Sequence, residues 1–442
     1  MLLRSLIWAG LLLGAAAGNA PSKIKGNHIE EPLNDNAAAE VPIIDQVFLT
    51  VHDVAMQKES ARHKQEKEKL LQRLERGNGK WDASHPRHRL LDALHGFRKY
   101  YDRNVEDVKR WKKLYKNVSR EQKQLLEKTV HYSSKFSKVE HRLAENHQLC
   151  QRMLDNALEF YGVERSELDE HIRVTEENKK AAEKVSVSQA LKHLVRDWSD
   201  EGVGERADAF PCLLKTLDSL FPERKAEESV KLLLPGAGLG RLGHELAALG
   251  GFEVTNNEWS MYMNIVYRFL ESLTTKEAES AYPFVDYWSH HVSNADMMRQ
   301  VAFPDKPVNT TAVLLLEGDF TTVFRKKEGS FDAVVTHFFI DTARNLMSYL
   351  DTIHRLLPPG GYWVNFGPLL YGTGPFVQLS LEEILAVAEK MGFEFLDTAE
   401  ECGDLTIEGK KVRGLQAVYG FNDKALTRNA YQAQFWVARK KA

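Results

Sequence analysis

The chain is 442 residues long, which is more than one average domain uses, so two folded units and a tail are expected. Its 59 Lys and Arg residues nearly balance its 62 Asp and Glu residues. This balance argues against nucleic acid or an acidic membrane surface as the main partner, and it favours a small substrate.

Cysteine and histidine positions give no sign of a metal. The three cysteines, Cys150, Cys212 and Cys402, lie far apart and form no C-x-x-C pair, which predicts neither a disulfide framework nor a zinc site. The pair His290-His291 has no acidic or thiol ligand at metal spacing, and adjacent residues on a strand point apart. We therefore expect no metal ion.

The N-terminal sequence has the pattern of a secretory signal peptide. Arg4 precedes an apolar run at residues 6–17, and small residues follow it, which predicts a signal peptide over residues 1–20 with cleavage near Ala20. The run is too short to span a bilayer comfortably. The alternative is an uncleaved apolar start or a faulty start codon. Residues 21–45 are polar and without periodicity, so they are expected to form a flexible linker.

The sequence pattern of residues 46–202 predicts an all-α region. Lys and Arg residues between Lys58 and Arg142 alternate with Asp and Glu, which favours a solvated helix surface with i,i+4 ion pairs over a nucleic-acid patch. Apolar residues at steps of three and four predict a buried helix face. These are Leu90, Leu94, Phe97, Tyr101, Val105, Val108, Trp111 and Tyr115.

Residues 203–442 alternate short apolar runs with helical stretches, which predicts an α/β domain with a mostly parallel seven-stranded sheet. Helices are expected at 343–357, capped by Asp341 and Thr342, and from Ser380, where Glu383 completes a capping box. The strands are expected at 231–234, 253–256, 312–316, 333–336, 362–366, 393–396 and 434–438.

A glycine loop follows the first of these strands and precedes a predicted helix. Its Gly236, Gly238 and Gly240 would present backbone N–H groups at the carboxyl end of the strand. A dinucleotide fold needs glycine three residues after Gly238, but Arg241 stands there, so a pyrophosphate-bearing cofactor is disfavoured. No Gly-Lys-Ser/Thr closes a P-loop. Alone, such a run is also typical of any tight strand-to-helix turn.

Acidic residues at the ends of the next two strands limit the class of ligand that this site can bind. Glu258 lies twenty residues past Gly238, where an acid accepts both hydroxyls of a ribose. Asp319 and Phe320 follow the third strand and suit the amino group and the ring of adenine. Alternatively, Asp319 caps a turn and Phe320 belongs to the core. Taken in order, the three strand ends indicate an adenosyl cofactor without phosphates.

Two longer motifs carry a family resemblance. Residues 336–345 read Thr-His-Phe-Phe-Ile-Asp-Thr-Ala-Arg-Asn, and residues 365–371 read Asn-Phe-Gly-Pro-Leu-Leu-Tyr. Together with residues 194–199 and the glycine loop, they closely resemble the carnosine N-methyltransferase family from about residue 90 to the C-terminus. The resemblance implies a helical region joined to a Rossmann-like domain that uses S-adenosylmethionine to methylate the imidazole of carnosine, giving anserine.

The glycine loop and the resemblance together assign the cofactor site. Arg196 suits the methionine carboxylate because a guanidinium holds a carboxylate in two-point geometry, although a surface pair with Asp197 is the alternative. His193 stands where the family can have Gln. The predicted cofactor residues are His193, Arg196, Gly236, Gly238, Gly240, Glu258, Asp319, Phe320 and His337.

For the methyl acceptor, the resemblance implies Asp341, Tyr419 and Tyr431. Without the resemblance, helix capping for Asp341 and core packing for both tyrosines are equally reasonable. One departure concerns the acceptor. The family motif Pro-Leu-Leu-Tyr-His ends here in Gly372, so a histidine implicated in holding the dipeptide is absent, and the loop at 372–378 is shortened. The expected acceptor is carnosine or a related small histidine-containing molecule or peptide.

Two other functions stay open, namely a secreted non-catalytic binding protein on a methyltransferase fold and a nucleotide-dependent oxidoreductase. The signal-like start predicts the secretory pathway or the cell exterior, with weak support from sequons at Asn117 and Asn309. The resemblance instead implies cytosol and nucleus. It also implies a homodimer through the helical region.

Overall fold

A computed structural model describes residues 60–372 and 374–442, so the predicted signal peptide and the linker lie outside the described residues. The strands are β1 Val230–Pro235, β2 Phe252–Glu258, β3 Glu279–Ala281, β4 Val301–Phe303, β5 Val313–Glu317, β6 Ala333–His337, β7 Tyr362–Gly367, β8 Phe393–Leu396, β9 Asp404–Leu405, β10 Arg413–Val418 and β11 Ala430–Lys440.

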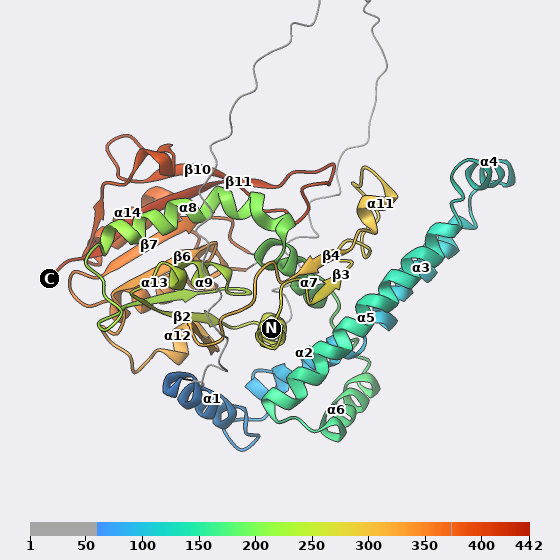
Figure 1. The fold of residues 1–442 in the computed structure, drawn as a ribbon, viewed down its shortest axis with the longest axis horizontal. Coiled ribbons are helices and arrows are strands. Elements are labelled where there is room, and N and C mark those ends of the chain that lie inside the picture. The colour runs from blue at the N-terminus through green and yellow to red at the C-terminus, as the bar shows by residue number, and fades with distance from the viewer. Residues whose placement is uncertain (1–59, 373) are drawn as a thin grey trace, which may run out of the picture. The chain divides into compact units, whose positions relative to one another are not determined.

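The helices begin before the sheet and then alternate with its strands (Figure 1). They are α1 Ala61–Leu74, α2 Pro86–Arg98, α3 Tyr100–Tyr115, α4 Arg120–Val130, α5 Ser134–Tyr161, α6 Arg165–Glu177, α7 Val185–Trp198, α8 Val203–Leu220, α9 Arg241–Ala248, α10 Met261–Glu271, α11 Asn294–Met297, α12 Phe320–Val323, α13 Leu346–Leu356 and α14 Leu381–Lys390, with short 3₁₀ turns η1 Asp200–Gly202, η2 Ile340–Thr342 and η3 Glu400–Cys402.

The main sheet has the order β5-β2-β1-β6-β7-β11-β10-β9, and β8 pairs with β11. Strands β5, β2, β1, β6 and β7 are parallel, while β11 runs antiparallel to β7, β8 and β10. All seven predicted strands are present, and the α/β class with a mostly parallel sheet is confirmed. Within the described residues the sheet has nine strands, because β9 and β10, which were not predicted, extend it.

Alternating side chains of β1 fill two apolar layers. Leu233 points to the layer that contains residues of α12, α13 and α14. Leu232 and Leu234 point to the other, with residues of α8 and α9. Because successive side chains of a strand leave on opposite sides, the uninterrupted run Leu232–Leu234 is the pattern of a strand covered on both faces.

The predicted apolar stripe of the helical region is divided between α2 and α3, which meet at Lys99. Leu90, Leu94 and Phe97 are fully buried in a core that also includes Ile265 of α10 and Leu315 of β5. The helical region therefore shares its core with the sheet domain. A boundary at 202/203 stays a prediction.

Polar contacts also join the helical region to the sheet edge. The Tyr161 hydroxyl of α5 donates to Glu317 Oε2 at 2.9 Å, and Arg268 Nε of α10 donates to Glu317 Oε1 at 2.9 Å. Side chains of α1 contact backbone carbonyls of the edge, as in the 3.0 Å contact between His63 Nε2 and the Val313 carbonyl. Such cover protects an exposed sheet edge from pairing with another chain.

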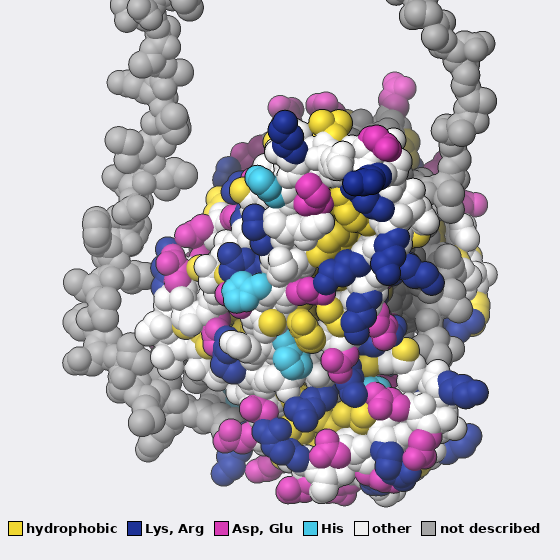
Figure 2. All heavy atoms as spheres, turned by 90° about the vertical axis from the view of Figure 1, so that its right-hand side faces the viewer, with side chains coloured by type: hydrophobic (Ala, Val, Ile, Leu, Met, Phe, Trp, Pro, Cys, Tyr) yellow, Lys and Arg dark blue, Asp and Glu magenta, His cyan; other side chains and the backbone are white. Residues whose placement is uncertain are grey.

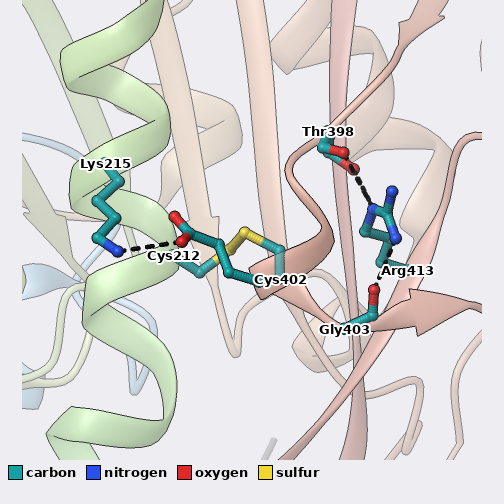
Figure 3. The surroundings of a disulfide bond; sticks show 7 residues. Cys212, Lys215, Thr398, Cys402, Gly403 and Arg413 are labelled. Atoms are coloured by element: carbon teal, nitrogen blue, oxygen red, sulfur yellow. Dashed lines mark hydrogen bonds and ion pairs between the residues drawn. A yellow bond between two sulfur atoms is a disulfide. The ribbon is translucent and has the colours of Figure 1, made fainter.

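One disulfide corrects the cysteine prediction. Cys212 of α8 and Cys402 of η3 are bonded, with their Cα atoms 5.4 Å apart, although 190 residues separate them (Figure 3). The expectation of no disulfide was wrong because only the packing of α8 beside η3 brings these two residues together. Cys150 is free and buried. Every helix within the described part of the chain is too short or too polar to cross a membrane.

Replacing Cys212 and Cys402 by serine should lower the free energy of unfolding by about 2–4 kcal/mol, because the crosslink restricts the unfolded chain. Urea unfolding with and without reductant measures this. Reductant should destabilise the wild-type protein and leave the double variant unchanged. Thiol titration in denaturant should find one reactive thiol before reduction and three after it; three thiols before reduction would contradict the bond.

Candidate active site

The glycine loop connects β1 to α9 at the carboxyl edge of the parallel strands. Gly236 and Gly238 have φ values of 67° and 58°, in the left-handed region where other residues are strained. A Cβ atom on Gly236 would lie 2.2 Å from the Phe339 ring. The loop therefore needs glycine at position 236 both for its backbone conformation and for the approach of this ring.

Glu258 ends β2 directly beside the loop. Its Oε2 accepts a hydrogen bond from the Gly238 N–H at 2.9 Å, and its Oε1 accepts from the N–H groups of Trp259 and Ser260 at 2.8 and 2.7 Å. Burial raises the pKa of Glu258 above its ordinary value, while the three N–H donors oppose this rise. The carboxylate is thus oriented by backbone at the position where the sequence predicts a ribose.

Helix α7 places His193, Arg196 and Asp197 on the other side of the loop. A Cβ atom on Gly238 would lie 3.6 Å from His193 Nδ1 and 3.7 Å from an Arg196 terminal nitrogen. Arg196 donates to both Asp197 carboxylate oxygens, at 2.7 and 3.2 Å, and to His193 Nδ1 at 2.9 Å. Because a guanidinium only donates, Nδ1 of this imidazole must be the acceptor.

The pairing of Arg196 with Asp197 is present, but its location differs from the surface pair considered from sequence. The Arg196 side chain is only 12% exposed, and its guanidinium lies 4.7 Å from the centre of the Tyr419 ring. Burial disfavours the charge, yet Asp197 and Tyr419 outweigh it and keep the pKa of Arg196 above its ordinary value. A fixed cation therefore stands beside the glycine loop.

Asp319 and Phe320 have structural roles in this geometry. Asp319 caps α12, because its Oδ1 accepts from the backbone N–H and the hydroxyl of Thr321 at 2.9 and 2.5 Å. Phe320 is buried and packs edge-on against Phe339. Both alternatives weighed from the sequence are thus realised, and contact of these residues with adenine stays a prediction.

His337 ends β6 in an apolar setting. Its ring packs near Phe210, Phe338 and Phe366, and burial followed by the charge of Arg196 lowers its pKa to about 3. Its Nε2 atom is buried and has no hydrogen-bond partner among the described residues. A buried polar atom without a partner is costly, so this nitrogen fits a site that a ligand completes.

Two of the three predicted acceptor residues, Tyr419 and Tyr431, pack against Phe338, and the third, Asp341, lies three residues further along the chain. The Phe338 ring stacks on Tyr419 with centres 4.7 Å apart and packs edge-on against Tyr431 at 6.0 Å. Burial, and after it the charge of Asp341, raise the pKa of Tyr431 to about 12. Phe338 was not predicted as a site residue. The backbone of Phe338 has a left-handed φ of 50°, which sets the direction of its ring. No sequence pattern predicts such a conformation.

Asp341 does not cap the following helix, which begins at Leu346 after Asn345. Its side chain is 7% exposed, its Oδ2 accepts from the Leu370 N–H at 3.0 Å, and burial raises its pKa to about 7. The capping alternative is therefore wrong. Near neutral pH this carboxyl group can either hold a proton or carry the charge that binds an amine.

The loop after β7 is held at three points although it lacks the family histidine at Gly372. The Leu370 N–H is bound by Asp341, the Phe376 N–H donates to the Arg344 carbonyl at 2.7 Å, and the Tyr371 hydroxyl donates to the Leu379 carbonyl at 2.8 Å. These three hydrogen bonds tie the loop to Asp341, to the Arg344 carbonyl and to its own Leu379 carbonyl.

Arg241, the first residue of α9, anchors α7 to the glycine loop. It donates to the Asp197 carbonyl at 2.9 Å and to Asp305 Oδ1 at 2.5 Å. Arg206 of α8 donates to Asp305 Oδ2 at 2.9 Å and to the Arg196 carbonyl at 2.6 Å. The residue that replaces a dinucleotide-fold glycine thus helps to position the cation on α7.

Comparison with known proteins finds one family along this part of the chain. A family model described as carnosine N-methyltransferase matches residues 173–442. A carnosine N-methyltransferase of Schizosaccharomyces pombe is 35% identical over 276 residues, which cover 57% of this chain and 70% of the relative. A carnosine N-methyltransferase of Mus musculus is 28% identical over 376 residues, which cover 83% of this chain and 89% of the relative.

Replacing Asp341 by asparagine should stabilise the protein at high pH. A carboxyl group whose folded pKa is raised to about 7 contributes stability below its unfolded pKa and loses it as pH rises through 7. The variant should therefore exceed wild type by on the order of 1–3 kcal/mol at pH 8.5 and match it near pH 4. Urea unfolding across pH measures the difference. Asp351→Asn, at an exposed position of α13, is the control and should show no such trend.

Proposed function

The chain belongs to the carnosine N-methyltransferase family, and we propose that it methylates an imidazole nitrogen of carnosine or of a related small histidine-containing dipeptide or peptide. The predicted enzyme class, an S-adenosylmethionine-dependent methyltransferase, is confirmed by this membership. The acceptor is the open part of the proposal, because Gly372 replaces a family histidine.

The observation that carries the proposal is the continuity of the two halves of the site through neighbouring residues. The Phe339 ring approaches Gly236 of the glycine loop, while the ring of the preceding Phe338 stacks on Tyr419 of the acceptor cluster. One segment at the end of β6 therefore borders both the predicted cofactor and the predicted acceptor. Such a juncture is what a direct transfer between two bound molecules requires.

The residues near the glycine loop fit S-adenosylmethionine. The Glu258 carboxylate lies beside the loop at the predicted ribose position, and the Arg196 guanidinium stands with His193 beside Gly238 as a cation for the methionine carboxylate. His337 has a buried nitrogen without a hydrogen-bond partner among the described residues. When bound, the cofactor supplies a methyl carbon that is already activated for displacement. The protein must then align a nitrogen lone pair with that carbon and exclude water.

The acceptor cluster suits an imidazole and an amine. Phe338, Tyr419 and Tyr431 offer flat apolar surfaces on which a ring can pack, and the tyrosine hydroxyls can bind the ring nitrogen that is not methylated. That hydrogen bond would fix the productive tautomer, in which the attacking nitrogen is unprotonated. Asp341 can bind the substrate ammonium group or take up a proton, since its pKa lies near 7.

The purified protein should transfer methyl groups from labelled S-adenosylmethionine to at least one acceptor among carnosine, homocarnosine, histidine and histidine-containing peptides. Separation of the labelled products measures this. Cofactor binding without transfer to any of them would favour the non-catalytic binding protein. Stabilisation by NADH in place of S-adenosylhomocysteine in a thermal shift would instead favour the oxidoreductase.

A matched pair of variants checks the cofactor side. Glu258→Gln should weaken S-adenosylhomocysteine binding about 10–100-fold in calorimetry, because a hydrogen bond to a charged group is lost. Glu253→Gln, on the same strand but paired with Arg62 on the surface, should leave binding unchanged. Equal effects of both substitutions would contradict the role of Glu258.

We also propose that the protein enters the secretory pathway. The support is the signal-like start, the Cys212–Cys402 bond, which suits an oxidising compartment, and the exposure of both sequon asparagines, Asn117 and Asn309. Asn117 lies between α3 and α4, and Asn309 lies between β4 and β5. A homodimer through the helical region also remains a prediction.

Expression in eukaryotic cells should yield a protein that starts near residue 21 and loses mass on treatment with peptide N-glycosidase. N-terminal sequencing and gel mobility measure both. Asn117→Gln and Asn309→Gln should each remove one glycan, and the double variant should not respond to the enzyme. An unglycosylated protein with an intact N-terminus in cytosol and nucleus would contradict this location and match the family expectation.

A further inference from the structure

A cluster of side chains of the types that can bind a metal ion lies in the helical region, outside the site described above. His88 and Asp92 are one turn apart on α2, and His171 faces them from α6. His171 Nε2 is 2.9 Å from Asp92 Oδ1, and His88 Nδ1 is 3.5 Å from Asp92 Oδ2. One ligand atom from each of the three residues lies within 4.8 Å of the other two.

A cavity of about 340 Å³ borders this cluster. Both histidines line it, together with Trp81, Val174 and Thr175. The Nδ1 atom of His88 is buried and makes no hydrogen bond within the described residues.

We propose that His88, Asp92 and His171 bind a divalent transition metal ion, with Zn²⁺ as the best match. Two imidazole nitrogens and a carboxylate oxygen are ligands that zinc accepts, whereas Ca²⁺ and Mg²⁺ prefer sets made of oxygen. Tetrahedral zinc takes four ligands, and the bordering cavity has room for a water molecule as the fourth. Because 79 residues separate Asp92 from His171, no local sequence pattern indicates this cluster.

Lys180 is the competitor for this site. Its Nζ lies 2.9 Å from Asp92 Oδ2, and its side chain is 39% exposed. In the metal-free protein this ammonium neutralises Asp92. On metal binding it would be repelled by the ion, and because the side chain is long and partly exposed, it can move to solvent. Removal of the ammonium should therefore strengthen metal binding.

Metal binding would fasten α2 to α6. The neighbouring Arg89 on α2 stacks on the Trp259 ring, at 3.6 Å from its centre, and Trp259 directly follows the predicted ribose acid Glu258. A clamp on α2 thus acts on the element that supports one wall of the cofactor site. We expect the metal to raise thermal stability, since a ligand that binds only the folded state stabilises it.

The test is titration of the chelator-treated, full-length protein with Zn²⁺ by calorimetry and with Co²⁺ by visible spectroscopy. Wild type should bind one equivalent, and Co²⁺ should give the intense absorption of a tetrahedral site. His171→Gln should weaken binding at least 10-fold while retaining a polar group, and Lys180→Met should tighten it. Circular dichroism must show that both variants are folded.

His141 and Glu145 of α5 provide a matched control, because they form an i,i+4 pair of the same kind with no third candidate ligand near them among the described residues. His141→Ala should leave binding unchanged. Equal losses in His141→Ala and His171→Gln would show only non-specific binding and overturn the proposal. Binding by Lys180→Met but not by wild type would overturn it as well, because the lysine would then be the native partner of Asp92.

Discussion

The buried contact between Arg241 and Asp305 is the constraint around which the cofactor site is organised. Arg241 begins α9 immediately after the glycine loop, and its guanidinium binds both Asp305 and the Asp197 carbonyl at the end of α7. Breaking a buried ion pair by removing one partner costs about 3–5 kcal/mol. The pair therefore strongly favours one arrangement of loop and helix, in which Arg196 stands beside Gly238.

This arrangement explains why part of the site lies before the sheet in the sequence. Helix α7 precedes β1 by more than thirty residues, yet the Trp198 indole donates to the Leu239 carbonyl of the loop at 2.8 Å. The position that a dinucleotide fold gives to glycine is used here for a side chain that holds another helix. In the sequence, Arg241 argues against a pyrophosphate-bearing cofactor. In the structure, the same residue also holds α7, which carries Arg196, beside the glycine loop.

Patterns local in sequence predicted most of the fold. The buried parallel strands were found because both of their faces are apolar, and the helix at Ser380 was found because its capping box is complete. β10 was missed because its sequence Arg-Gly-Leu-Gln-Ala-Val is neither alternating nor uniformly apolar, and its pairing with β11 defines it. The Cys212–Cys402 bond was missed for the same reason, since only tertiary packing brings its ends together.

The site residues also divide into those that local sequence patterns predicted and those that depend on tertiary packing. Glu258 was predicted because strand ends and glycine spacing are visible in a sequence, and the structure places it against the Gly238 N–H. The family resemblance, not periodicity, pointed to Tyr419, which directly follows the unpredicted β10, and to Tyr431, which lies on β11. Phe338 was not found, because its role depends on a backbone angle that follows from the packing of β6 against β7.

The disulfide described above also closes a covalent ring. The chain from Cys212 to Cys402 contains every strand from β1 to β8, the glycine loop and Asp341, and the bond joins its two ends. A single backbone cut inside this ring, for instance in the partly exposed loop after β7, would leave both fragments attached. A nicked molecule would then keep its parallel strands together, and only reduction would release the pieces.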